Sequence, residues 1–333
     1  MQTEASRIAV ITGSLTSGDI IGAWKARWGI GRMSYIVPPG LYAIGEPNQA
    51  SPVVVTANYK MSYDLVRSEM GRQSIWLLVL ETFGINVWCA AGKGTFGTGE
   101  LVRRIESSNL SRVVSHRRLI VPIMGAAGVK AIEVKKRSGF EVRFATLRIE
   151  DLPAYLDNDM TPAREMRELT FSFRERLVLT PIEIVGGMKS LPYVGLPLAL
   201  LAGFTGGGFS LNRFLTVLVL YIISVFCGTF LAPLFLPLLP GRMFSVKGAI
   251  AGLACSQVCV GILGRFAPVG RLDSAAMILL MVTVSAFYAM NFTGSTPFTS
   301  PSGVSLEMKR SLPVMASATV VGIVLLVMRI FLP

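Results

Sequence analysis

A glycine-rich stretch in the first third of the chain holds the residues best suited to chemistry. Residues 84–99 read GINVWCAAGKGTFGTG and place one thiol, Cys89, four residues before one ammonium group, Lys93. A nearby positive charge and a helix N-terminus both lower the pKa of a thiol, and the thiolate is the form that binds metals. The residues alone leave two interpretations equally open: a functional thiol in a cofactor loop, or an inert cysteine buried behind Trp88.

Two nucleotide-binding interpretations fit these glycines poorly. A Walker A loop requires a glycine five residues before the glycine that precedes the lysine, and Val87 occupies that position. Gly92, Gly94 and Gly97 match the spacing G-x-G-x-x-G of dinucleotide-binding loops. The preceding apolar run ends too early for that motif, however, and no Asp or Glu lies at 115–120 to bind a ribose.

Short apolar runs alternate with helical patterns around this stretch. The runs predict strands at 52–57, 75–81, 119–124 and 141–147. Apolar residues at helical spacing predict helices at 62–71, 97–107 and 128–138, and short helical pieces at 152–157 and 162–168. Strands that alternate with helices indicate an α/β domain with a parallel sheet, here of Rossmann-like type, which binds ligands beyond the carboxyl ends of its strands. Residues 1–40 show no clear periodicity.

The composition of the whole chain is that of a membrane protein with a charged head. Of the 333 residues, 52% are hydrophobic and only 16% are charged, whereas soluble domains carry roughly 25%. Residues 1–190 hold 24 of the 32 Lys and Arg residues and 18 of the 20 Asp and Glu residues. This pattern excludes an ordinary soluble enzyme. It predicts a head at 1–180 with its core at 39–150, a linker at 181–190 and a membrane domain at 191–333.

Five apolar stretches in the last part of the chain predict an all-α transmembrane domain of five helices, because a span needs roughly 20 residues. They lie at about 191–205, 214–236, 246–263, 274–292 and 312–332. The first is short and rich in Pro and Gly, so it is either a span or a re-entrant segment. Loop Lys and Arg residues favour a multi-pass protein of the inner membrane with its head in the cytoplasm and its C-terminus outside.

Charge and cysteine usage limit the partners that we expect. The net charge of +12 comes from basic residues interleaved with acidic ones or placed beside apolar runs, so no nucleic-acid partner is expected. The head contains one His and one Cys and cannot assemble a Cys/His zinc site. Cys255 and Cys259 lie four residues apart on one helix face. They are able to bind a soft metal, although helix packing is the commoner role for these two and for Cys227.

Three segments of the head resemble a known family. They read PGLYAIGEPNQASPVVVTANYKMSYDLVR (39–67), LLVLETFGINVWCAAGKGTFGTGELVRRI (77–105) and VVSHRRLIVPIMGAAGV (113–129). They are similar to the corrinoid-binding domain of the corrinoid iron–sulfur protein large subunit and the acetyl-CoA decarbonylase gamma subunit. Those proteins carry a four-Cys iron–sulfur segment and a barrel domain, whereas this chain carries apolar spans. A corrinoid domain followed by five spans resembles the HgcA family, the corrinoid proteins of the mercury-methylating pair.

This resemblance implies a membrane-anchored, corrinoid-dependent methyltransferase that transfers methyl from cobalt to inorganic Hg(II) and forms methylmercury. It implies Cys89 as the lower axial cobalt ligand of a cobalamin-type, base-off corrinoid; a thiolate there donates strongly, so methyl leaves as a carbanion or radical equivalent. The implied partners are a ferredoxin-like protein with two [4Fe–4S] clusters and a methylfolate-dependent methyltransferase as methyl donor. The alternatives are an anchored methyl carrier of the acetyl-CoA (one-carbon) pathway and a membrane transport protein with a sensor head.

The remaining cofactor contacts that we expect come from three places in the head. The loop that presents Cys89 consists of Asn86, Val87, Trp88, Gly92, Lys93 and Gly94. Thr56 and Asn58, at the end of the first predicted strand, are expected to line the corrinoid face. Gly125 and Ala126, after the third, are expected to admit the nucleotide tail, and Lys93 to keep the thiol ionised.

Overall fold

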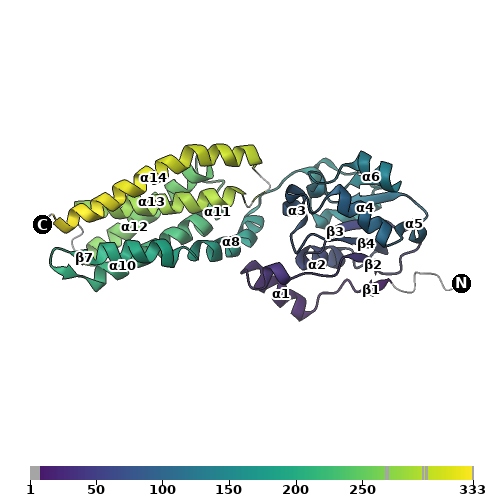
Figure 1. Cartoon of the computed structure of the whole chain (residues 1–333), viewed down its shortest axis with the longest axis horizontal. Coiled ribbons are helices and arrows are strands. Elements are labelled where there is room, and N and C mark those ends of the chain that lie inside the picture. Colours follow the sequence, from purple (N-terminus) through teal and green to yellow (C-terminus); the bar gives the residue numbers. More distant parts are fainter. Residues whose placement is uncertain (1–7, 267–269, 295, 297–298, 332–333) are drawn as a thin grey trace. The chain divides into compact units, whose positions relative to one another are not determined.

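The computed structural model describes residues 8–266, 270–294, 296 and 299–331. The chain divides into two compact units, Met1–Thr170, which is α/β, and Phe171–Pro333, which is helical (Figure 1). Helix α8, Phe173–Met188, begins at a capping box formed by Ser172 and Glu175. The boundary expected at residue 180 and most of the linker expected at 181–190 therefore fall on helix. The helix start depends on this cap and not on the change in charge content further along the chain.

Six strands of the first unit form one mixed sheet in the order β1-β2-β4-β3-β5-β6. They are β1 (Ala9–Ile11), β2 (Gly40–Ile44), β3 (Val53–Ala57), β4 (Ile75–Leu80), β5 (Arg118–Val121) and β6 (Glu141–Phe144). The last four match the predicted strands and run parallel. The predicted parallel arrangement is confirmed for these four strands, but the sheet as a whole is mixed, because β2 is antiparallel to its neighbour β4. The connection from β2 to β3, at 45–52, is too short for the crossover of a dozen or more residues that parallel strands need, so β2 runs opposite to β3 and to β4.

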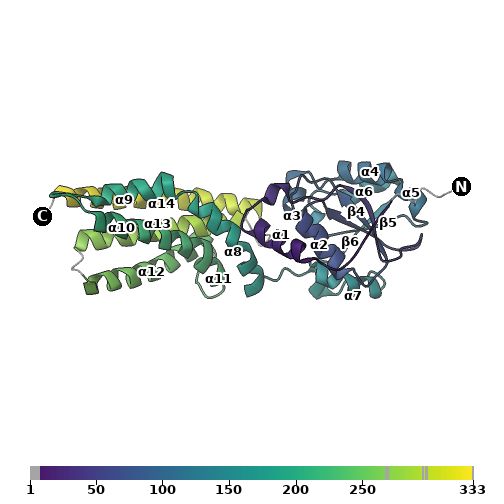
Figure 2. The ribbon, with the colours of Figure 1, turned by 90° about the horizontal axis from the view of Figure 1, so that it is seen from below.

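Helices cover both faces of this sheet, as Figures 1 and 2 show. One face carries α3 (Val87–Lys93), α4 (Thr98–Ser107), α5 (Leu110–Val113) and α6 (Ala131–Ser138), and the other carries α2 (Lys60–Glu69) and α7 (Leu152–Asp157). Strand side chains alternate between the two cores: Trp76, Leu78 and Leu80 of β4 pack in the first, and Ile75, Leu77 and Val79 in the second. This alternation is the reason that the β4 run is apolar throughout.

The strand order determines where a ligand fits. β3 is the first of the four parallel strands, and its neighbours are β4 on one side and β5 on the other. The connections that follow β3 and β5 therefore lead to opposite sides and leave a crevice beyond the carboxyl ends of these two strands. Within its described residues, the segment for which no structure was predicted contains two helices. They are α1 (Ser17–Arg27), which begins at a capping box between Thr16 and Asp19, and the short 3-10 helix η2 (Arg32–Ser34).

The second unit contains helices that are long and apolar enough to cross a membrane. Four such helices are found among the described residues: Leu211–Leu234, which includes α10 (Leu211–Phe226), and α12 (Phe244–Phe266), α13 (Arg271–Gly294) and α14, whose apolar stretch is Ser302–Phe331. Helix α8 and Leu191–Gly203 meet at a bend of 41° and make a fifth crossing if the pair is one span. The four helices overlap the last four predicted stretches, and the first predicted stretch, 191–205, overlaps the second half of the bent pair. Residue 332 and Pro333, whose side of the membrane was predicted, lie outside the described residues.

Two acidic residues of the long apolar helices, Asp273 and Glu307, lie near helix ends and have partners. Asp273, at the start of α13, is nearly buried and forms ion pairs of 3.2 Å with Arg213 and with Arg329. Glu307 accepts a hydrogen bond of 2.6 Å from the backbone of Ser245. This placement agrees with the absence of central charges in the predicted spans and favours a packing role for these groups.

Candidate functional site

A cavity of about 360 Å³ lies at the carboxyl ends of β3 and β5 in the first unit. Its position is the crevice that the strand order predicts. The walls come from the end of β3, from α2, from the start of α3, from the segment after β5 and from the segment after β6. Most of the lining side chains are apolar, and a few polar groups, including Thr56, Ser62 and Arg148, lie among them. Such a surface is typical of a pocket for a largely apolar cofactor or ligand.

Cys89 lies in the first turn of α3, directly after Asn86, Val87 and Trp88, which line this cavity; Cys89 itself is not among the lining residues. The side-chain oxygen of Asn86 accepts a hydrogen bond of 2.9 Å from the Cys89 amide and caps the helix, and Gly94 ends it with a left-handed φ of 80°. The sequence analysis placed Cys89 ahead of a helix that starts near residue 97; the structure gives it a short helix of its own. An Asn before apolar residues and a Gly after them is a signal that predicts such a helix.

Burial and nearby charges act in opposite directions on this thiol. Burial raises the pKa of Cys89, whereas the positive charges of Lys93 and Arg32 and a hydrogen bond from Asn86 lower it. The net pKa is above the ordinary value, so Lys93 acts in the expected direction but does not by itself keep the thiol ionised. A cation bonded to the sulfur would displace the proton.

Arg32 is a residue near the site that sequence reasoning missed. It lies in η2, with its guanidinium carbon 5.4 Å from the centre of the Tyr59 ring and a hydrogen bond of 3.3 Å to the Ala26 carbonyl. Its positive charge reaches Cys89 across 57 positions of sequence. No periodic pattern marks the segment around Arg32, so only the folded chain shows that Arg32 lies near Cys89.

Asn58 holds the loop between β4 and α3 and does not line the cavity. It is fully buried. Its side-chain oxygen accepts hydrogen bonds from the Thr82 amide (3.1 Å), the Thr82 hydroxyl (2.9 Å) and the Gly84 amide (3.2 Å), and its amide nitrogen donates to Glu81 (2.6 Å). The polar atoms of Asn58 therefore already have partners within the protein, and the side chain positions the loop that leads to Cys89.

This loop has an unusual backbone. Phe83 and Gly84 both have left-handed φ angles, of 56° and 73°. For a residue other than glycine this conformation costs about 1–3 kcal/mol and persists only where the surroundings impose it. The hydrogen bonds of Asn58 to both sides of Phe83 supply that constraint. Gly84 itself has no room for a side chain, since a Cβ there would lie 2.9 Å from Ile36.

The other expected cofactor contacts are divided by the structure. Four of them line the cavity or begin α3 at its wall: Thr56, Asn86, Val87 and Trp88. Three lie exposed at the end of α3: Gly92, Lys93 and Gly94. Gly125 is buried, and a Cβ there would lie 2.6 Å from the Phe96 ring, while Ala126 is exposed. Neither of these two lines the cavity; Pro122 and Met124 form that wall.

Replacing Asn58 with alanine is expected to destabilise the head. The change leaves the buried donors of Thr82 and Gly84 without an acceptor, and each unsatisfied buried group costs about 1–3 kcal/mol. We expect the free energy of unfolding to fall by about 3 kcal/mol. All four tryptophans lie in the head, so tryptophan fluorescence during urea denaturation of the full chain reports on this unit alone.

The matched control for this change is Asn158→Ala, at an exposed asparagine whose side chain makes one hydrogen bond, to the Thr161 carbonyl. Its expected cost is below about 1 kcal/mol. A similarly small cost for Asn58→Ala would contradict the role assigned to Asn58.

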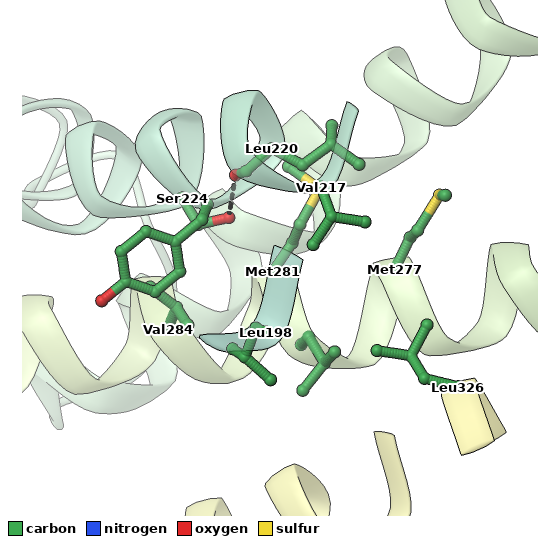
Figure 3. A pocket seen from close by; sticks show the side chains of 10 residues that line it. Leu198, Val217, Leu220, Ser224, Met277, Met281, Val284 and Leu326 are labelled. Atoms are coloured by element: carbon green, nitrogen blue, oxygen red, sulfur yellow. Dashed lines mark hydrogen bonds between the residues drawn. The ribbon is translucent and has the colours of Figure 1, made fainter. Parts of the chain in front are cut away.

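The helical unit contains a much smaller cavity, of about 30 Å³ (Figure 3). Apolar side chains such as Val217, Met281 and Leu326 surround it. The hydroxyl of Ser224 at its edge already donates a hydrogen bond of 2.6 Å to the Leu220 carbonyl. The cavity has room for little more than water and does not supply a second substrate site.

Fold and cavity define the first unit as an α/β domain with an open crevice at its topological switch point. Residues 31–149 match the family of the CO dehydrogenase/acetyl-CoA synthase delta subunit. The chain is 36% identical over 126 residues to the acetyl-CoA decarbonylase/synthase complex subunit gamma of Methanopyrus kandleri, and 31% identical over 128 residues to that of Archaeoglobus fulgidus. The two matches cover 37% and 38% of this chain.

The family match lies within the head. Each match spans 27% of the relative's length, so the chain corresponds to about a quarter of these curated relatives. The region matched by the family, 31–149, contains all four parallel strands and α3 with Cys89. The matched region therefore includes β3, β5 and α3, which border the crevice.

Proposed function

We propose that this chain is a membrane-anchored corrinoid protein that transfers a methyl group from cobalt to an acceptor. One observation carries the proposal: α3, which bears Cys89 in its first turn, begins at the wall of an open cavity at the switch point of a domain that is similar to acetyl-CoA decarbonylase/synthase gamma subunits. The helices of the second unit, long and apolar enough to cross a membrane, supply the anchor.

The residues present fit a base-off, cobalamin-type corrinoid in two respects. The cavity is mainly apolar with a few polar groups, which suits the buried parts of a large cofactor. The thiol of Cys89 is a soft ligand for a transition metal, and it is half-buried with two cations near enough to favour its thiolate. When bound, the corrinoid supplies the cobalt ion that holds the methyl group and releases it to an acceptor.

Each part of the site has its own task in this proposal. Cys89 would hold the cobalt ion through its sulfur. Asn86 fixes the start of α3 and so the direction of the thiol, and Asn58 fixes the loop before it. Lys93 and Arg32 favour the charged form of the sulfur.

Two acceptors have support. The relatives belong to acetyl-CoA decarbonylase/synthase complexes, and this favours an anchored methyl carrier of one-carbon metabolism. The resemblance of the NVWCAAGK segment to the HgcA family, together with the apolar helices, favours inorganic Hg(II). A thiolate such as that of Cys89 would donate electron density to the cobalt, and this would favour a soft cation such as Hg(II) as the methyl acceptor. We propose Hg(II) as the methyl acceptor. The second candidate function is that of a methyl carrier in one-carbon metabolism.

The proposal includes two protein partners and an orientation. A ferredoxin-like protein with two [4Fe–4S] clusters would supply electrons, and a methylfolate-dependent methyltransferase would supply methyl groups. The head would lie on the cytoplasmic side of the inner membrane, where both partners are soluble.

A single-turnover experiment distinguishes the two acceptors. The full chain in detergent, loaded with a methylated corrinoid, is mixed either with Hg(II) thiolate or with an acetyl-CoA synthase supplied with carbon monoxide and coenzyme A. We expect methylmercury from the first mixture. Acetyl-CoA from the second mixture without methylmercury from the first would assign the carrier role. A chain that shows no cobalt-corrin absorption bands after reconstitution contradicts both.

A further inference from the structure

Two cysteines of the helical unit lie side by side on different helical segments. Cys227 begins a π-helical segment, Cys227–Leu231, and Cys255 lies near the middle of α12. Their sulfur atoms are 3.4 Å apart. Cys227 is fully buried, Cys255 is half-buried, and both are free thiols. The spacing in the sequence placed Cys255 and Cys259 on one helix face. The structure adds a contact between the sulfur of Cys255 and that of Cys227, 28 positions away.

Close helix packing brings the two thiols together. A Cβ at Gly228 would lie 2.5 Å from the Ser285 carbonyl oxygen, and a Cβ at Gly252 would lie 2.8 Å from the Ser285 side chain. The segment that carries Cys227 and the helix that carries Cys255 therefore both approach the same turn of α13 at a distance that only glycine permits. The π-helical turn at Cys227 is a second feature that is frequent at functional sites.

We propose that Cys227 and Cys255 bind a soft divalent cation as a two-coordinate dithiolate within the helical unit. Thiolates are the ligands that soft cations prefer. The cation forms two metal–sulfur bonds, both S–H bonds break, and two protons are released to solvent. The resulting complex is neutral because two thiolates cancel the two positive charges. Neutrality matters among apolar helices, where an uncompensated charge is costly.

The number of ligands selects the cation. Within the part of the chain that the structure describes, no group of three or more His, Cys, Asp or Glu side chains is placed to hold a metal ion. Zn²⁺ takes four ligands, whereas two thiolates in a line satisfy Hg(II). Metal–sulfur bonds of about 2.3 Å would separate the sulfurs of a linear complex by about 4.6 Å, more than the 3.4 Å between the free thiols. A side-chain rotation of the half-buried Cys255 provides the difference.

This site goes beyond the proposed function, because it involves neither the corrinoid nor Cys89. It gives the helical unit a task that an anchor lacks, namely holding a soft cation within the membrane. The proposed site is independent of which acceptor receives the methyl group from the head.

The test uses the full chain in detergent without oxygen and without corrinoid, with Cys89→Ala to leave only the three thiols of the helical unit. HgCl2 is the probe. We expect one Hg(II) per chain to resist an excess of a monothiol such as glutathione, because two thiols held in one protein act as a chelate. Added without the competitor, one equivalent should release two protons, and X-ray absorption should show two sulfur neighbours.

Serine variants assign the ligands. Cys227→Ser and Cys255→Ser should each weaken Hg(II) retention at least about 100-fold, since the chelate is lost. Cys259→Ser, one turn along α12 from Cys255, is the matched control and should leave retention unchanged. Cys227→Ala and Cys255→Ala repeat the comparison without a hydroxyl group in the bundle.

Several results would overturn the site: no retention by the three-thiol chain, release of one proton, three sulfur neighbours, an equal loss in Cys259→Ser, or a disulfide between Cys227 and Cys255 in the anaerobic protein. The X-ray measurement needs no further variant, so it decides even where a serine chain fails to fold. None of these measurements depends on methyl transfer, so a negative methylation assay leaves their outcome unaffected.

Discussion

Replacing Cys89 with alanine is expected to abolish methyl transfer while the head remains folded. The change removes the only thiol of the head and with it the proposed cobalt ligand. Cys89 is small and only half-buried, so the free energy of unfolding should fall by about 1 kcal/mol or less. Methylmercury production and tryptophan fluorescence during urea denaturation measure the two effects. Loss of activity with an unchanged denaturation curve would show that the sulfur acts chemically.

Cys89→His separates ligation from turnover. Imidazole is able to bind cobalt but donates less electron density than a thiolate, so corrinoid binding should be retained without normal turnover. Cys259→Ala, a thiol outside the proposed corrinoid site, should leave methylation unchanged. Near-native methylmercury production by Cys89→Ala would disprove the ligand assignment, and a histidine variant less stable than the alanine variant would favour an inert, packed cysteine.

Ser62→Trp is expected to weaken corrinoid binding about 100-fold, which corresponds to roughly 2.7 kcal/mol. Ser62 lies on α2 and lines the cavity at the carboxyl ends of β3 and β5. An indole ring at this position would occupy space that the cofactor needs, and the partly exposed position lets the helix tolerate it. Titration of the full chain with corrinoid, followed by the change in visible absorption, gives the dissociation constant.

The same helix offers the control. Ser68 also lies on α2 but does not line the cavity. Ser68→Trp should bind corrinoid as the native chain does. Equal weakening in both variants would indicate a disturbed helix and not a filled cavity, and unchanged binding in Ser62→Trp would place the cofactor elsewhere.

Residues 1–44 mark the limit of local patterns in the head. The strand β2 runs antiparallel to its neighbour β4, and η2 carries Arg32 to the vicinity of Cys89. Neither feature has a periodic signature. Both result from contacts between residues that are far apart in the sequence, so no window of neighbouring residues contains the information.

Asn58 shows the same limit at a single position. Its place after a buried strand predicts a ligand contact, because the carboxyl ends of parallel strands line the crevice. Which neighbour takes its hydrogen bonds depends on the conformation of the loop at 81–84, which no pattern around Asn58 describes. The buried amide must be satisfied somewhere, and the loop is nearer than the cavity.

The sequence by itself determined the parallel strands β3 to β6, the helices α2, α4 and α6 between them and the apolar helices, and it singled out Cys89 as a candidate. Burial of apolar side chains imposes periods of two and 3.6 residues that can be read locally, and a lone thiol among glycines stands out without a structure. Only the tertiary structure decided that Asn58 positions the loop, that Arg32 lies near the thiol and that Cys227 meets Cys255. These pairings depend on how separate elements pack, and packing joins residues whose separation in sequence carries no signal.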